Sequence, residues 1–400
     1  MINSLLAYFI LLPIGSYLLF NVLYLLSLAV AGRLKTRTDI PAGRQPVRFR
    51  RIAVLIPAYK EDTVIIDSVQ ANLRQQYPSD AYDIYVIADS FKPETLETLR
   101  HYPVQVLEVQ FEQSTVQKSL TQALNLLPEN RYEVVVVSDA DNHMAPDFLQ
   151  QVNLAFDSGW RAVQGHRVAK NTNTGVAVFD AMNEEVNNHL FRAGQRALGL
   201  SASLIGSGMA FEPERMKRAM TRLRTVGGYD KELEMLLMLE GIKIAYLPKA
   251  YIYDEKVQNL EVFERQRTRW IAAQIQFLKF YYPTGIRQLL QGRWDAANGF
   301  IKALILPRTL LLATLCFGVL VGLVTGFQAV LLGMGSLLGI LAVTLLISIP
   351  GYLWEKLSFR DVFTFPRLVF RMICSLLKFK TAEKKFIHTP HGETVISKNG

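Results

Sequence analysis

Three long stretches of this chain contain no charged side chain. They cover residues 1–32, 309–327 and 329–350. Because a helix rises about 1.5 Å per residue, each stretch is long enough to cross the roughly 30 Å hydrocarbon core of a bilayer. We therefore predict three transmembrane helices, the last two forming a hairpin that turns near residues 326–328. Residues 29–31 (Ala-Val-Ala) resemble a signal-peptide cleavage site, but the first stretch has no basic start and is too long, which favours an anchor.

The region between these stretches alternates short apolar runs with amphipathic ones. Strands are predicted at 52–59, 82–90, 104–110, 133–141 and 160–168, and helices at 64–76, 93–102, 115–127 and 146–156. Strands separated by helices indicate an α/β fold, a Rossmann-like and mostly parallel sheet covered on both faces. In such sheets, ligands bind beyond the carboxyl ends of the strands.

Two aspartates follow the most apolar of these strands. The four valines at 134–137 lead to Asp139 and Asp141, whose positions on an extended chain are about 6–7 Å apart. Oxygen ligands with no cysteine nearby suit Mg²⁺ or Mn²⁺ better than zinc. The alternative is a loop in which an aspartate caps the helix that begins near Pro146. His143 could join a metal site or be a solvated loop residue.

Other polar side chains end strands at the same edge of the predicted sheet. Tyr59 and Glu61 follow the first strand and Asp89 ends the second. Tyr59 could stack on a nucleobase, and the two carboxylates could accept hydrogen bonds from a base or a ribose. Each could instead be a cap or turn residue. Carboxylates on three loops of one edge favour a binding site.

The order of these motifs resembles that of membrane-bound family 2 glycosyltransferases, which include cellulose, hyaluronan and poly-N-acetylglucosamine synthases. The resemblance covers about residues 50–275 and is carried by IPAYKED (56–62), Asp89, KSLTQALN (118–125), SDAD (138–141) and QRTRW (266–270). It implies a GT-A fold and transfer of a sugar from a nucleotide diphosphate donor, usually UDP-linked, with inversion at the anomeric carbon.

The resemblance also implies roles for individual residues. Asp89 would contact the uridine, and Lys118 matches the basic residue near the nucleotide. Asp139 and Asp141 would handle the diphosphate and a divalent cation. The acceptor and pyrophosphate side would be lined by Gln266, Arg269 and Trp270, and the loop GSGMAF (206–211) would lie at the donor sugar and acceptor.

The general base is the one motif that departs from the family pattern. The family places it in a Thr-Glu-Asp triplet that opens a helix, whereas this chain reads GGYDKELEMLLMLEG at 227–241. Asp230 and Glu232 are both candidates, and the spacing to Gly241 and Gln266 favours Asp230. A carboxylate is needed there because an acceptor hydroxyl is a poor nucleophile near neutral pH. Both acids could instead be helix-start residues favoured by the dipole.

Basic residues follow the first and the last apolar stretch, and the turn at 326–328 has neither lysine nor arginine. The positive-inside rule then places the N-terminus outside and residues 33 to about 300, with the tail, in the cytoplasm at the cell (inner) membrane. The net charge of +9 is explained by anionic lipids, so nucleic acid is not an expected partner. Cys316 and Cys374 form no disulfide framework, as expected in a reducing compartment.

The tail predicts an amphipathic helix lying in the membrane interface, with a soluble surface helix as the alternative. Its basic residues Arg360, Arg367, Arg371 and Lys378 share one face. His388 and His391 resemble a short tail motif that follows the last membrane segment in some relatives and could fold over the donor. The predicted organisation is a transmembrane helix (1–32), a basic juxtamembrane linker (33–51), a GT-A catalytic domain (52–275), interfacial helices (276–308), a transmembrane hairpin (309–354) and a cytosolic amphipathic tail (355–400).

The favoured function is an inverting glycosyltransferase that acts at the cytoplasmic membrane face on a lipid-linked or saccharide acceptor. A catalytically silent sensor or partner subunit that binds nucleotide sugars is the alternative, supported by the irregular base motif. A transporter is disfavoured because the three spans carry no internal charge. Polymer export would need a channel, so three spans per chain favour a short product, unless a homo-oligomer or an export partner contributes.

Overall fold

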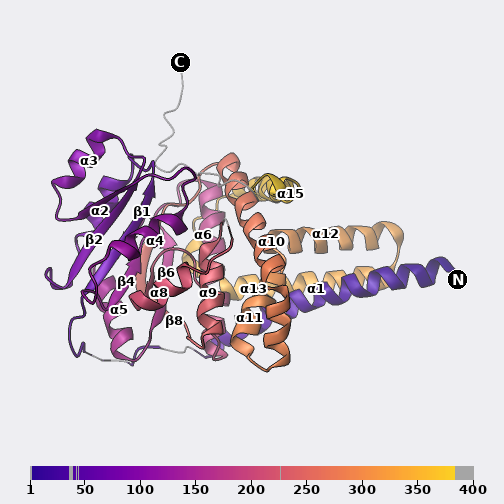
Figure 1. The fold of residues 1–400 in the computed structure, drawn as a ribbon. Coiled ribbons are helices and arrows are strands. Elements are labelled where there is room, and N and C mark those ends of the chain that lie inside the picture. Colours follow the sequence, from indigo (N-terminus) through magenta and orange to yellow (C-terminus); the bar gives the residue numbers. More distant parts are fainter. Residues whose placement is uncertain (1, 36–38, 42, 44, 226, 383–400) are drawn as a thin grey trace, which may run out of the picture.

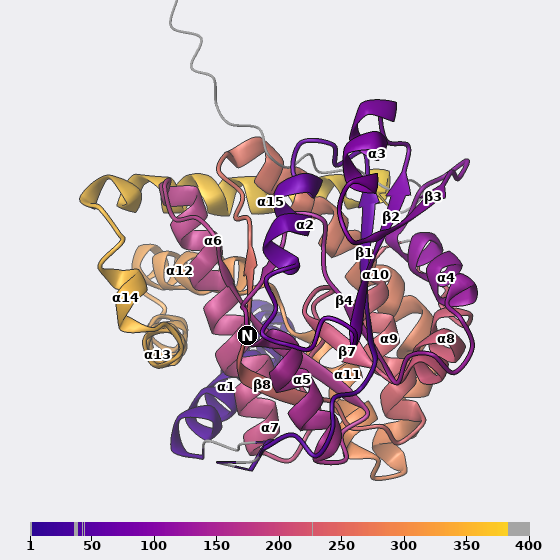
Figure 2. The same cartoon turned by 90° about the vertical axis from the view of Figure 1, so that its left-hand side faces the viewer.

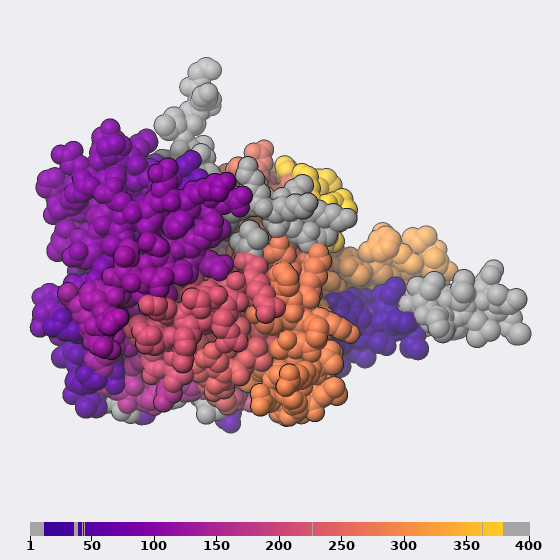
Figure 3. Space-filling view, viewed as in Figure 1, coloured from indigo at the N-terminus to yellow at the C-terminus, as the bar shows by residue number. Residues whose placement is uncertain are grey.

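The structure, a computed structural model, describes residues 2–35, 39–41, 43, 45–225 and 227–382. Within these residues, the chain forms an α/β domain, a bundle of three long apolar helices and further helices beside them (Figure 1). In the space-filling view, the bundle projects as a narrow stalk from the bulkier α/β part (Figure 3). The predicted tail motif with His388 and His391 lies outside the described residues.

One twisted sheet organises the α/β domain, and its strand order is β3-β2-β1-β4-β7-β6-β8-β5. The first four strands in this order are parallel. Strand β7 runs antiparallel between β4 and β6, β8 is parallel to β6, and β5 is antiparallel to β8. The mostly parallel sheet predicted from the alternation is confirmed. The strands are β1 (Ile52–Tyr59), β2 (Tyr82–Asp89), β3 (Gln105–Val109), β4 (Val134–Val137), β5 (His143–Met144), β6 (Ala162–Ala169), β7 (Met209–Phe211) and β8 (Ala245–Asp254).

Helices cover both faces of this sheet because its central strands are apolar on both sides. Alternate residues of a strand point to opposite faces, so Ile52, Val54 and Ile56 of β1 pack on one face and Ala53 and Leu55 on the other. The first face is covered by α2 (Ile65–Asn72), α3 (Pro93–Arg100) and α5 (Phe148–Asp157), the second by α4 (Val116–Leu126), α8 (Pro213–Met220) and α9 (Tyr229–Leu239).

The four valines of β4 explain why a buried strand ends in acids. All four are fully buried, Val134 and Val136 in one layer of the core and Val135 and Val137 in the other. The strand is thereby fixed in the centre of the sheet between β1 and β7. Asp139 and Asp141 consequently leave the sheet at the carboxyl edge that it shares with β1.

A second group of helices connects the α/β domain to the stalk. Helix α6 (Gly175–Asn187) continues into a π-helical turn, η1 (Asn188–Gly194), and a short α7 (Gln195–Ala197). The QRTRW motif lies on α10 (Leu260–Leu290), which is followed by α11 (Trp294–Leu304). The side chain of Asn259 caps α10 by accepting from the backbone N–H of Val262 at 2.8 Å. The boundary proposed at residue 275 therefore falls inside one continuous helix.

Three helices are long and apolar enough to cross a membrane, at residues Leu12–Leu34, Arg308–Thr325 and Gln328–Ser348. They belong to α1 (Ile2–Leu34), α12 (Arg308–Thr325) and α13 (Gln328–Ser348). Gly326 ends α12 with φ +67°, a left-handed conformation that favours glycine. The predicted hairpin turn is therefore where the sequence places it.

The last described segment comprises α14 (Gly351–Trp354), a 3₁₀ turn η2 (Phe359–Phe363) and α15 (Thr364–Ala382). Helix α15 is seen end-on in Figure 1 and lengthwise in Figure 2, so it runs across the direction of the stalk. Leu368, Met372 and Ser375 are buried on its inner face, while Phe370 and Leu377 are 63% and 78% exposed. This arrangement is typical of a helix that lies on a membrane surface.

Candidate active site

A cavity of about 730 Å³ begins at the carboxyl ends of β1 and β4 and extends to the start of α12. Its walls come from the loops after these two strands, from α6, from the first turn of α9, from α10 and from the helices near the membrane. The cavity brings together eight residues that the sequence singled out: Tyr59, Glu61, Asp139, Asp141, Asp230, Gln266, Arg269 and Trp270.

The paired aspartates stand at the sheet end of the cavity. The backbone N–H of Asp139 donates to Ser207 Oγ at 2.9 Å, and Asp141 is 4% exposed. With its amide oriented to satisfy its neighbours, Asn142 donates to Asp141 Oδ1 at 3.0 Å and to Asp254 Oδ1 at 3.1 Å. Among the described residues no group of three or more His, Cys, Asp and Glu side chains is placed to hold a metal ion.

This donor set fits a hard cation that takes its other ligands from a substrate and water, as Mg²⁺ does. His143 lies elsewhere, because its Nε2 is 3.0 Å from Asp67 Oδ2 and 2.8 Å from Lys170 Nζ. The structure ties this histidine to that pair and not to the aspartates.

Only some of the residues predicted to bind the nucleotide line the cavity. Tyr59 and Glu61 line the cavity, and Asp89 is paired with Tyr59 in the β1–β2 register. Asp89 is fully buried; its Oδ1 accepts from Ser90 Oγ at 2.9 Å, but its Oδ2 has no partner within the described residues. A buried carboxylate oxygen without a donor is rare. Asp89 is not among the residues that line the cavity, so its contact with a uridine stays a prediction.

Lys118 is not part of the cavity wall. It lies on the exposed side of α4, where its Nζ donates to the carbonyl oxygen of Gln113 at 2.7 Å. Its neighbours Ser119, Gln117 and Thr115 line the cavity instead. The helix bearing the predicted motif is therefore at the site, but this side chain points away from it.

Asp230 projects into the cavity from the first turn of α9. Gly228, with φ +63°, precedes the helix, and the Tyr229 hydroxyl donates to the carbonyl oxygen of Gly206 at 2.7 Å. A Cβ placed on Gly206 would lie 3.9 Å from Asp230 Oδ2. The small-residue loop predicted at the donor sugar is thus held directly beside the carboxylate.

Glu232 occupies a different place. It is fully buried, and its carboxylate accepts from the backbone N–H groups of Arg224 and Thr225, the Thr225 hydroxyl and the Tyr281 hydroxyl at 2.8–3.1 Å. It does not border the cavity. The geometry therefore gives Glu232 a role in holding the loop before α9 and leaves Asp230 facing the site.

The three residues of QRTRW that were singled out all line the cavity. Gln266 Oε1 is buried without a partner among the described residues. Burial lowers the pKa of Arg269, and the carboxylates of Asp139 and Asp230 oppose this shift. Arg269 therefore lies within the electrostatic influence of both acids.

Arg267, which the sequence reasoning did not single out, positions Trp270. Its guanidinium carbon is 4.0 Å from the centroid of the Trp270 ring and 4.7 Å from that of Phe263. It also forms a buried ion pair with Asp180 of α6. Cation–π stacking of this kind fixes the orientation of an indole, and Trp270, 38% exposed, lines the cavity.

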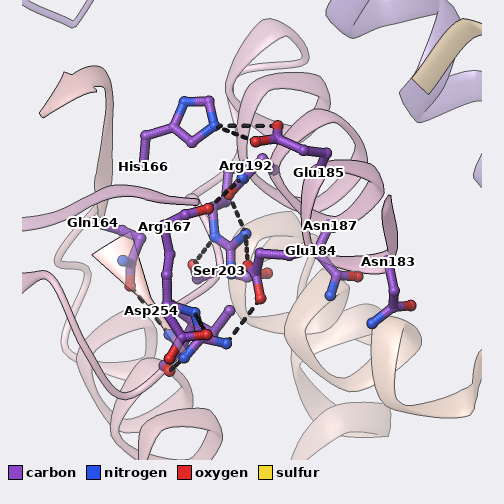
Figure 4. A network of polar contacts seen from close by, with 12 residues as sticks. Gln164, His166, Arg167, Asn183, Glu184, Glu185, Asn187, Arg192, Ser203 and Asp254 are labelled. Atoms are coloured by element: carbon purple, nitrogen blue, oxygen red, sulfur yellow. Dashed lines mark hydrogen bonds and ion pairs between the residues drawn. The ribbon is translucent and has the colours of Figure 1, made fainter. Parts of the chain in front are cut away.

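A buried network of ion pairs also lines the cavity (Figure 4). The sequence analysis did not predict it. Glu184 Oε2 is 2.8 Å from Arg167 Nη2, and Glu184 Oε1 is 3.2 Å from Arg192 Nη1. Lys256 Nζ is 2.5 Å from Asp254 Oδ2. Burial raises the pKa of Glu184, but Arg167, Lys256 and Arg192 outweigh it and hold that pKa below its usual range. Arg167 on β6, Glu184 on α6 and Lys256 after β8 are far apart in the sequence, so no local pattern could have brought these three together.

The similarity to known proteins agrees with this geometry. Residues 50–273, more than half of the chain, match the family described as glycosyltransferase like family 2. The probable glycosyltransferase YdaM of Bacillus subtilis (strain 168) is 26% identical over 259 residues, 60% of each protein. The beta-monoglucosyldiacylglycerol synthase of Trichormus variabilis is 25% identical over 271 residues, 64% of this chain and 56% of that protein. The chain thus matches less than two thirds of the length of either relative.

A solved structure supports the fold. The mannosyltransferase PcManGT from Pyrobaculum calidifontis, in complex with GDP-Man and Mn²⁺, superposes with a TM-score of 0.50 at 17% identity. The match covers 86% of this chain and 99% of that chain. The chain belongs to glycosyltransferase family 2, and its α/β domain has the GT-A fold.

Proposed function

We propose that this chain is a membrane-embedded inverting glycosyltransferase. It moves a sugar from a nucleotide diphosphate donor, UDP-linked, to a hydroxyl group of a lipid-linked or saccharide acceptor at the cytoplasmic membrane face. The observation that carries the proposal is a single cavity that contains Asp139 and Asp141 at one end, Asp230 and Arg269 beside them, and membrane helices at the other end. Family membership and the named activities of the relatives support it.

In the proposed reaction, Asp230 takes the proton of the acceptor hydroxyl while its oxygen bonds to the anomeric carbon. The bond from that carbon to the diphosphate oxygen breaks on the opposite face, which inverts the configuration. Arg269 offers a planar pair of N–H donors that suit phosphate oxygens. Trp270 offers an apolar face against which a sugar ring can lie.

Asp139 and Asp141 are the residues that would hold a divalent cation, Mg²⁺ or Mn²⁺. Such a cation, when bound, neutralises charge that gathers on the leaving diphosphate. PcManGT, which shares the fold, was solved with Mn²⁺ and a nucleotide sugar. Asp89, with its unpartnered Oδ2, would accept a hydrogen bond from the uracil or the ribose, next to Tyr59.

The test is nucleotide release by the purified full chain in lipid nanodiscs, with a panel of UDP-sugars and either Mg²⁺, Mn²⁺ or EDTA. We expect release that requires a cation and falls at least about a hundredfold in Asp139→Asn and Asp141→Asn. UDP binding without release from any donor, in nanodiscs that contain native lipid extract, would contradict the transferase and favour the silent sensor.

A further inference from the structure

The cavity continues beyond the proposed transfer site and becomes apolar near the membrane. Side chains from α6, α12, α13 and α15 form this part, including Phe179, Val186, Leu312, Leu345, Ile349 and Leu368. Leu312 and Leu345 belong to helices that are apolar enough to span a bilayer. An alkyl chain entering from the lipid phase would therefore meet an apolar surface all the way to the polar end of the cavity.

An arginine without an acidic partner stands where the apolar and polar parts meet. Arg308 is the first residue of α12 and lines the cavity. Its Nη2 donates to Asn183 Oδ1 at 2.5 Å and to Asn187 Oδ1 at 2.8 Å; within the described part of the chain no carboxylate forms an ion pair with it. Figure 4 shows both asparagines to one side of the ion-pair network around Glu184. Neutral amides orient this guanidinium, and the charge of Glu184 acts on it without forming an ion pair.

Two further polar groups at this point have no partner among the described residues. Thr309 Oγ1, one residue along α12, is buried and makes no hydrogen bond. Arg267, only 5% exposed, lines the same cavity, and its Nε is likewise unpartnered. Within the described residues, a guanidinium held only by amides therefore lies in the same cavity wall as two buried polar atoms that have no hydrogen-bond partner.

We propose that this place binds the phosphate of an anionic lipid that serves as the acceptor, an inference that rests on the proposed function. The alkyl chains lie along α12, α13 and α15, Arg308 holds the phosphate, and a free hydroxyl of the same head group reaches Asp230. The phosphate is an anchor and takes no part in bond formation. The hydroxyl oxygen bonds to the anomeric carbon, its proton goes to Asp230, and the nucleoside diphosphate leaves.

Two sources supply this chemistry, a phosphoglycerolipid with a hydroxylated head group and a polyprenyl phosphate that carries a saccharide. The experiment measures binding of radiolabelled phosphatidylglycerol to the purified full chain in detergent micelles, without donor. Phosphatidylglycerol and a polyprenyl-phosphate-linked saccharide are expected to compete, and the stronger competitor identifies the source. Diacylglycerol with the same chains, or inorganic phosphate alone, competing as well as phosphatidylglycerol would overturn the inference.

Two variants at the proposed phosphate site and one control variant distinguish a loss of lipid binding from misfolding. Arg308→Gln should weaken phosphatidylglycerol binding at least about tenfold, because hydrogen bonds to a charged group are lost. Asn183→Asp keeps Arg308 but gives it a carboxylate partner, and should weaken binding in the same direction. Arg360→Gln, which removes an exposed basic residue near the same membrane face, should leave binding unchanged.

The same preparations should bind UDP with the affinity of the unmodified chain, which shows that the α/β domain is folded. Lipid binding that is equal in Arg308→Gln, Asn183→Asp and the unmodified chain would overturn the inference and leave the transferase proposal standing. Intact, Arg308-dependent lipid binding in a chain that releases no UDP from any donor would contradict the proposed function alone.

Discussion

At the scale of single residues, the sequence reduced the candidates for the general base to Asp230 and Glu232. It could not decide between these two side chains. Side chains two positions apart on a helix point about 200° from each other, so only one of them can face a given cavity. The sequence does not reveal which face of α9 borders the site. In the structure Asp230 lines the cavity, whereas Glu232 is fully buried against the preceding loop and Tyr281.

Glu232→Gln is expected to lower stability while sparing catalysis. Glutamine cannot accept from all the donors that now surround this carboxylate, and an unsatisfied buried group costs about 1–3 kcal/mol. Thermal melting of the detergent-solubilised chain should show the loss, with UDP release per folded molecule near that of the unmodified chain. An unchanged melting temperature combined with a hundredfold slower release would assign the base to Glu232 instead.

Lys231 makes stability depend on pH. Burial, followed by the nearby Lys302, lowers its pKa from 10.5 to about 8. Between these two values the unfolded chain binds more protons than the folded one, so stability rises with pH across this window. Lys231→Met removes the buried charge, and we expect it to raise the melting temperature near pH 7 by more than it does near about pH 9.5. A gain that is the same at both pH values would contradict this account.

At the scale of elements, periodicity predicted the strands and helices of the first half of the domain because each has an apolar face and a turn at either end. Strands β5, β7 and β8 were not predicted. Strand β7 is three residues long and lies within the GSGMAF loop. A strand this short has too few positions for alternation to show. Gly206 of the same loop lies beside Asp230, so the missed element adjoins the site.

The buried ion pair between Asp180 of α6 and Arg267 of α10 is expected to be important for the stability of the fold. Asp180→Asn leaves Arg267 as a buried charge with no acid, and breaking such a pair typically costs about 3–5 kcal/mol. Thermal melting should show this loss. Replacing both partners, Asp180→Leu with Arg267→Met, should recover part of it, because apolar residues tolerate burial. A double variant that is less stable than Asp180→Asn would contradict the explanation.

At the scale of the whole molecule, the sequence separated a catalytic domain from membrane segments, but the cavity is built from both. Residues from β1 to Met372 of α15 contribute to it. Helix α15 docks on α10, where Arg371 and Lys378 each place a nitrogen 2.7 Å from Glu264. Contacts between residues so far apart in the sequence leave no local pattern. A single cavity that runs from the sheet to the apolar helices could therefore not be predicted.

The proposed topology places the hairpin turn outside the cell and α14 inside it. In a background with Cys316→Ser and Cys374→Ser, a membrane-impermeant maleimide should label Gln328→Cys in intact cells. It should label Glu355→Cys only after permeabilisation. Both positions are exposed in the structure, so accessibility alone does not separate them. The reverse labelling pattern would invert the orientation and place the donor site outside.

The most direct test of the central claim compares catalysis and binding in Asp230→Asn. UDP release should fall by about 10²–10⁴-fold, the usual contribution of a positioned general base. UDP affinity, measured by calorimetry in the presence of Mn²⁺, should stay within about threefold, because Asp139, Asp141 and Asp89 are untouched. Release at the rate of the unmodified chain would contradict the account.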